Sequence, residues 1–293
     1  SDFSRNYGFN FTKPFLIQCL AAVYTSKADF KKNVDIWPTS STKEIFNSWK
    51  KTERGLGRTI EFVTGTVKWD SDIWLPSINA LIPLVYLFSN YKFTHNDRLV
   101  ARKWLIQSCV YQAFSGSVYS ELERILRGLS KDCTIEKLVN LLKRKTGRIQ
   151  PFHFETGRKS GPAMALYISL LRNTNAKNWI NRTSLDGTVA GHNAELQIHH
   201  FFPRALLKQH NFSIDQINTF ANYTIISKDT NLDIRDAEPI DYIKKCKIKK
   251  SDLIAQCIPS NEELWKVKNY KAFLLERRKL LSKASNSFLD SKK

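Results

Sequence analysis

Residues 196–203 are the most informative stretch of the chain, with the sequence Leu-Gln-Ile-His-His-Phe-Phe-Pro. The stretch is short and apolar-rich and it closes on a proline, which is typical of a β-strand that ends at a turn. A second strand is predicted over 223–226, where Tyr-Thr-Ile-Ile is dense in β-branched and aromatic residues. The two segments predict a small hairpin that carries neighbouring histidines, His199 and His200, at the end of its first strand.

Helices are predicted on both sides of this hairpin. Apolar residues recur at helical spacing over 15–23, 41–63, 98–114, 118–129, 135–145 and 163–171, and again after the pattern Pro-Ser-Asn-Glu-Glu at 259–263 as far as 281. The sequence Ser-Thr-Lys-Glu at 41–44 has the S-x-x-E form of a capping box. The predicted fold class is therefore mainly α with a small α+β unit: a helical bundle, then a ββα hairpin and a basic C-terminal helix.

Three domains are expected along the chain. They are a helical domain over 1–185, a ββα core over 186–245, and a basic helical tail over 246–293 that packs on the core. The first boundary is placed after a stretch rich in Asn, Thr, Ser and Gly over 173–193, which is typical of a loop.

The composition excludes several classes of protein. The 293 residues include 46 Lys+Arg and 27 Asp+Glu, which gives a net charge of +19, and 42% are hydrophobic. A chain of this kind can bury a core, which excludes disordered and collagen-like proteins. The longest apolar stretch, 73–88, contains Pro76 and Pro83, so no membrane span is predicted. Five scattered cysteines without a Cys-x-x-Cys pair favour a reducing cytoplasm over a disulfide framework or a thiolate zinc site.

The basic charge is unevenly distributed. Residues 241–293 carry 14 basic and 6 acidic side chains, whereas residues 190–240 carry 4 and 6. This excess indicates an anionic partner, nucleic acid before acidic lipid. If DNA approaches the histidine-rich middle segment, flanking cations must hold its phosphates, although ordinary surface charge is the alternative. The candidate DNA-binding residues are Lys228, Arg235, Lys244, Lys245, Lys247, Lys249 and Lys250.

Two asparagines follow the histidine pair at intervals that a ββα unit would use. Asn222 comes 22 residues after His200, and Asn231 comes nine residues later. Such a unit gathers polar side chains around one divalent cation, which acts as a Lewis acid in phosphodiester cleavage. A neutral imidazole is the side chain best matched to take a proton from water at cellular pH. The alternative is a pair of packed or solvent-facing histidines, with asparagines that serve turns and caps.

The residues His-His-Phe-Phe-Pro at 199–203, followed by Asn222 and Asn231, resemble the His-Asn-His (HNH) nuclease motif. The form is similar to the C-terminal nuclease part of GmrSD-type modification-dependent restriction endonucleases. The resemblance covers about 98–243 and includes Phe-Ser-Gly-Ser at 114–117 and Asn-Trp-Ile at 178–180. It implies a metal-dependent endonuclease that cuts double-stranded DNA in the bacterial cytoplasm as a defence against phage. It also implies a separate N-terminal nucleotide-hydrolysing sensor domain, whose Asp-Gly-Gln-Gln-Arg signature does not occur in this sequence.

The resemblance also implies a role for each residue of the motif. His200 would be the general base, and Asn222 would complete the catalytic pair by orienting the hairpin and the base. His199 and Asn231 would hold one divalent metal ion. Many relatives have Asp before the base and His at the last position, so these positions supply no carboxylate here. Mg²⁺ is expected because it is abundant, and an imidazole ligand also suits Mn²⁺, Ni²⁺ or Zn²⁺.

Other interpretations of the sequence stay open. Glu195 is a candidate partner for one of the imidazoles, while His192 and His210 are interpreted as structural or surface groups. The whole protein could be a DNA-binding module without activity, in which the charge of +19 acts alone. It could also be an HNH nuclease or toxin that cuts RNA.

Overall fold

The computed structural model describes residues 9–28, 41–142, 146–156, 161–185 and 196–292. The chain divides into two compact units, one made of Ser1–Gly147 with Leu289–Lys293, the other of Arg148–Phe288. The described part is mainly helical and contains one two-stranded antiparallel sheet. The coarse fold class expected from the sequence is therefore confirmed. None of the helices in the described ranges is both long and apolar enough to cross a membrane.

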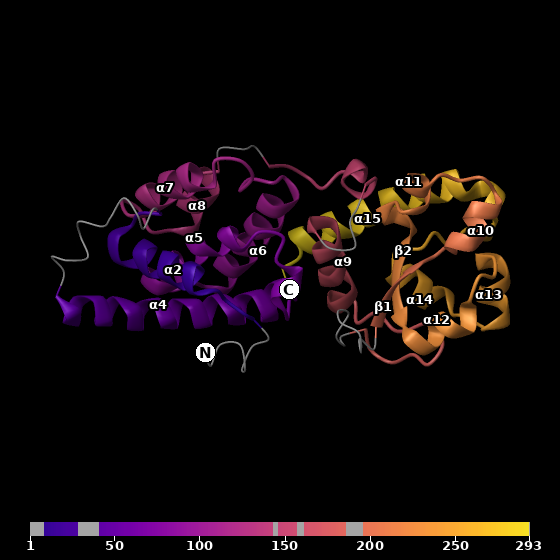
Figure 1. Ribbon diagram of the computed structural model, residues 1–293, viewed down its shortest axis with the longest axis horizontal. Coiled ribbons are helices and arrows are strands. Elements are labelled where there is room, and N and C mark those ends of the chain that lie inside the picture. Colours follow the sequence, from indigo (N-terminus) through magenta and orange to yellow (C-terminus); the bar gives the residue numbers. More distant parts are fainter. Residues whose placement is uncertain (1–8, 29–40, 143–145, 157–160, 186–195, 293) are drawn as a thin grey trace. The chain divides into compact units, whose positions relative to one another are not determined.

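The regular secondary structure described in the first unit consists of helices (Figure 1). The longest helix of this unit, α4, packs against α5, a helix whose residues from Leu81 to Phe88 are all buried. The two come close at Gly55, where an added Cβ would lie 2.8 Å from the carbonyl oxygen of Val85. The elements of this unit are α2 (Lys13–Thr25), α4 (Thr42–Phe62), η2 (Val63–Val67), η3 (Asp72–Trp74), η4 (Ile78–Ala80), α5 (Leu81–Asn90), α6 (His95–Val110), α7 (Val118–Leu129) and α8 (Ile135–Asn140).

The second unit contains the sheet (Figure 1). Strands β1 (Leu196–His200) and β2 (Tyr223–Ser227) pair in antiparallel fashion, with His199 opposite Thr224 and His200 opposite Tyr223. Helix α12 (Lys228–Ile234) follows β2 directly and contacts both strands. The other elements are η5 (Pro151–Phe154), α9 (Pro162–Asn173), α10 (Arg204–Gln209), α11 (Ile214–Ile217), η6 (Phe220–Asn222), α13 (Pro239–Lys245), α14 (Lys250–Ala255), η7 (Glu262–Trp265), η8 (Val267–Asn269) and α15 (Tyr270–Asp290).

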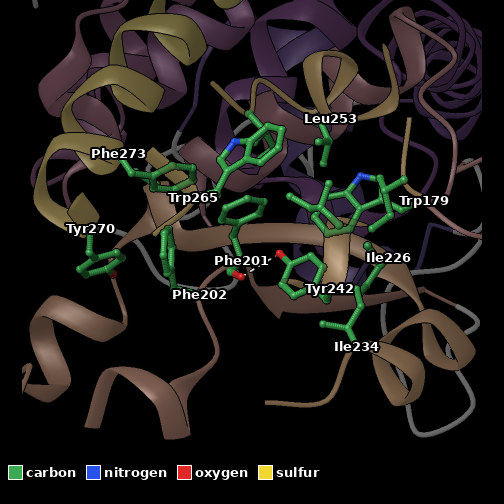
Figure 2. Packing of buried hydrophobic residues seen from close by; sticks show 14 of the residues in the cluster. Trp179, Phe201, Phe202, Ile226, Ile234, Tyr242, Leu253, Trp265, Tyr270 and Phe273 are labelled. Carbon is green, nitrogen blue, oxygen red and sulfur yellow. Dashed lines mark hydrogen bonds between the residues drawn. The ribbon is translucent and has the colours of Figure 1, made fainter. Parts of the chain in front are cut away.

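Two aromatic residues that follow the histidine pair anchor the end of β1 in the core. Phe201 and Phe202 are fully buried. The Phe201 ring stacks on Phe273 of α15 at 4.7 Å, and Phe202 meets Tyr270 edge-on at 5.1 Å (Figure 2). The hydroxyl of Tyr242 donates a hydrogen bond of 2.9 Å to the Phe201 carbonyl, drawn as a dashed line in Figure 2. Since burial of one such ring contributes roughly 1.5–3 kcal/mol, the strand end is held firmly.

The division by packing falls at Gly147, and α9 lies in the second unit, where the buried Tyr167 hydroxyl donates a hydrogen bond of 3.0 Å to Gln256. The expected boundary at 185/186 adjoins residues outside the described ranges. The C-terminal helix begins at Tyr270, not near 264, because the Asn261 side chain caps only the 3₁₀ turn η7 and Lys266 is extended.

Candidate catalytic and metal site

His199 is a buried histidine on the second-last position of β1. It is 8% exposed, and burial lowers its pKa from 6.5 to about 4. The nearby Asn231 side chain raises the pKa in part, and the nearby His200 lowers it further. The ring is therefore neutral at cellular pH, which is the state in which an imidazole ligates metals.

The structure brings Asn231 to His199, although 32 positions separate them in the chain. Gln197 and His199 lie two positions apart and so on the same face of β1, the face that α12 approaches. The Nδ2 amide of Asn231, on α12, donates a hydrogen bond of 2.9 Å to Oε1 of Gln197. His199 and Asn231 also border one cavity, and Gln197, which contacts Asn231, is a residue that sequence reasoning missed.

The start of α12 is held by a buried residue that the sequence analysis placed only in the segment before the motif. Asn178 is fully buried, its Oδ1 accepts a hydrogen bond of 2.8 Å from the Ser227 amide, and its Nδ2 donates one of 2.7 Å to Thr230 Oγ1. Ser227 also caps α12 by accepting from the Thr230 amide. These bonds fix the helix that carries Asn231.

The donor atoms at 199 and 231 fit a divalent cation. Nε2 of His199 is buried and has no hydrogen-bond partner among the described residues, which is costly unless a ligand completes it. An imidazole nitrogen with an amide oxygen suits Mn²⁺, Ni²⁺ or Zn²⁺ better than Mg²⁺, which prefers oxygen. Among the described residues, no three or more His, Cys, Asp or Glu gather in a group that could hold a metal. A cation here would therefore depend on further oxygens from water or a phosphate.

His200 is half-buried and lies beside a polar side chain. Its Nε2 lies 3.0 Å from Oδ1 of Asn218, and its ring meets Tyr223 edge-on at 5.0 Å. When Nε2 donates to Asn218, the lone pair that can take a proton lies on Nδ1. Asn218 follows α11 outside the motif, so no spacing in the sequence pointed to it.

Asn222 is fully buried and is bonded to the backbone on both sides. Its Oδ1 accepts from the Phe202 amide at 2.9 Å, and its Nδ2 donates to the carbonyls of Phe202 and Ile217 at 3.2 Å each. It does not line the cavity described next. Asn222 therefore orients the loop after the histidines, as the resemblance implies; its place in the catalytic pair stays a prediction.

An open cavity of about 660 Å³ lies against this constellation and includes both histidines and Asn231. Arg235, a sequence candidate for phosphate contact, is part of its wall, as is Arg204, which sequence reasoning missed although it directly follows Pro203. The remaining wall residues are Pro203, Leu232 and Asp236.

The other candidate DNA-binding residues do not line this cavity. All six lysines are exposed, and Lys250 pairs with Glu262 at 2.8 Å. His192 and Glu195 lie outside the described residues. His210 is exposed at the end of α10, in agreement with its interpretation as a surface group.

Comparison of the sequence with family models gave no match, and comparison with curated proteins gave no significant one.

Proposed function

We propose that this protein is a metal-dependent DNA endonuclease of the HNH type. The observation that carries the proposal is that His199, His200 and Asn231 border one cavity together with Arg204 and Arg235. These residues could bind and cleave a phosphodiester. They supply a buried imidazole nitrogen without a partner among the described residues, a second histidine and two guanidinium groups. In keeping with the resemblance, we further propose that the chain is the effector part of a bacterial anti-phage restriction system, active in the cytoplasm on foreign or modification-marked DNA.

In the proposed mechanism, Nδ1 of His200 takes a proton from a water molecule as the water oxygen attacks phosphorus in line. The P–O3′ bond breaks, O3′ takes a proton from solvent water, and the products carry 5′-phosphate and 3′-hydroxyl ends. Asn218 holds the His200 ring through Nε2. Arg204 and Arg235 supply positive charge beside the phosphate. His199 and Asn231 would hold the divalent cation, which when bound supplies Lewis-acid stabilisation of the phosphate oxygens.

Incubation of supercoiled plasmid with Mg²⁺, Mn²⁺, Ni²⁺ or EDTA tests the proposal. We expect nicking or linearisation with at least one metal and none with EDTA. His200→Ala should slow cleavage by about 10²–10⁴-fold, the usual contribution of a general base, while it still binds DNA. His210→Ala, which removes an exposed histidine of the same unit, should cut at the wild-type rate. Equal cleavage by His200→Ala would refute the assignment of the base.

A DNA-binding module without activity is the second candidate, and the net charge of +19 favours it. It predicts binding that weakens with salt and no cleavage with any of the three metals. An RNA-directed nuclease keeps the same chemistry at the site. Competition between labelled duplex DNA and RNA in the cleavage assay separates these substrates.

A further inference from the structure

We propose that Gln197 is a positioning residue that sets which atom of the Asn231 amide faces His199 and the metal site. The inference rests on the proposed function, because it concerns how the cation is held. It goes beyond the motif, since position 197 lies outside the histidine and asparagine pattern.

An asparagine can ligate a metal only through its oxygen, because the amide nitrogen has no available lone pair. The two ends of the amide are almost the same size, so packing does not distinguish them. A hydrogen bond must therefore select the orientation. In this site the bond is that between Asn231 Nδ2 and Gln197 Oε1, at 2.9 Å.

The hydrogen bond itself gives the direction of this amide pair. Two amides could pair in either sense, with each one as donor or acceptor. In the structure Asn231 donates through Nδ2 to Oε1 of Gln197. The oxygen of the Asn231 amide is therefore the end that is left for the cavity, which Asn231 borders together with His199.

Titration with Mn²⁺, followed by calorimetry and by the electron paramagnetic resonance of the free ion, tests the inference without any cleavage. Gln197→Met keeps the length of the side chain and removes the acceptor. We expect its Kd for Mn²⁺ to rise about 10–100-fold, the usual cost of removing a residue that orients a ligand. Gln197→Glu keeps an acceptor and removes the donor, so it should bind Mn²⁺ at least as tightly as the wild type.

Asn231→Asp provides the matched background, because a carboxylate presents an oxygen in either orientation. In that background, Gln197→Met should change the Kd by less than about threefold, well below the effect of removing an orienting partner. Thermal unfolding of each variant checks that the fold is retained.

The outcomes separate the two proposals. Equal Mn²⁺ affinity of the wild type and Gln197→Met overturns the positioning role and leaves the nuclease intact. A decrease in affinity of the same size in both backgrounds also overturns it, since the effect would then not depend on amide orientation. Wild-type protein that neither binds Mn²⁺ nor cuts DNA overturns the proposed function itself.

Discussion

His199 and His200 are neighbours in the chain but have different surroundings. His199 is buried, and its Nε2 has no hydrogen-bond partner in the described part of the chain, whereas His200 is half-buried with Nε2 close to Asn218. The two are the last residues of β1, and their side chains leave the strand in different directions although both border the same cavity. In the proposed mechanism, the buried imidazole would hold the metal and the half-buried one would act as the base.

The buried state of His199 predicts a pH-dependent stability in the absence of metal. Its pKa is about 4 in the folded protein and about 6.5 when unfolded, so the unfolded state binds the proton first as the pH falls. This contribution is fully present above pH 6.5 and is lost as the pH falls toward 4. In EDTA, the free energy of unfolding of the wild type relative to His199→Gln should drop by up to about 3 kcal/mol between pH 7 and pH 4. Urea unfolding at both pH values measures the drop, and a constant difference between the two proteins would contradict it.

At the scale of elements, buried amides hold the strand ends and α12 in place. Asn222 bonds the loop after β1, and Asn178 bonds the start of α12. Neither residue touches the cavity. The site therefore depends on side chains that reach backbone groups far from themselves in sequence.

Asn222→Ala should show how much the hydrogen bonds of the Asn222 amide contribute to stability. The change leaves the Phe202 amide and the carbonyls of Phe202 and Ile217 buried without their partner. We expect a decrease of about 2–5 kcal/mol in the free energy of unfolding, measured with urea, because unsatisfied buried groups carry their full desolvation cost. Gln209→Ala removes an exposed amide of the same unit and should stay within about 0.5 kcal/mol. Similar changes in the free energy of unfolding for both variants would show that the hydrogen bonds of Asn222 do not stabilise the fold.

The exposed lysines at the end of α13 allow a local interface to be distinguished from net charge. Replacing Lys244 and Lys245 by Gln should lower the slope of log Kd against log salt by about 0.9 for each phosphate that the two side chains neutralise. The control replaces Lys43 and Lys50, exposed on α4, and removes the same charge. We expect the control to change the slope less. Equal changes in DNA-binding titrations would show that charge acts without a defined interface at 244 and 245.

At the scale of the whole molecule, the net charge of +19 would govern approach to the proposed DNA substrate, while the cavity would govern the proposed chemistry. Binding should weaken roughly 10³-fold between 50 and 200 mM salt if about six phosphates are neutralised. His200→Ala should follow the same salt dependence as the wild type, because it removes no cation that contacts phosphate. Fluorescence anisotropy of a labelled duplex measures both curves, and a change of less than tenfold would show that charge contributes little.

Elements with local signals could be predicted from the amino-acid sequence. Apolar periodicity located α2, α4, α7 and α9 closely, and the capping box at Ser41 and Glu44 forms as predicted. The two strands also lie where β-branched and aromatic residues cluster. Such signals are readable because each depends on residues a few positions apart. The presence of His199 and Asn231 at one cavity was accessible only through the resemblance to a nuclease motif, since no short-range pattern links residues 32 positions apart.

The partners around the site, by contrast, follow from the folding of the chain in three dimensions. Gln197 meets Asn231, Asn218 meets His200, and Arg204 joins Arg235 at one cavity, although these residues lie far apart in sequence or outside the motif. The grouping of α9 with the second unit is likewise a matter of packing. Such contacts depend on how β1, β2 and α12 are placed by the aromatic core and the buried amides, and a linear pattern carries no information about those distances.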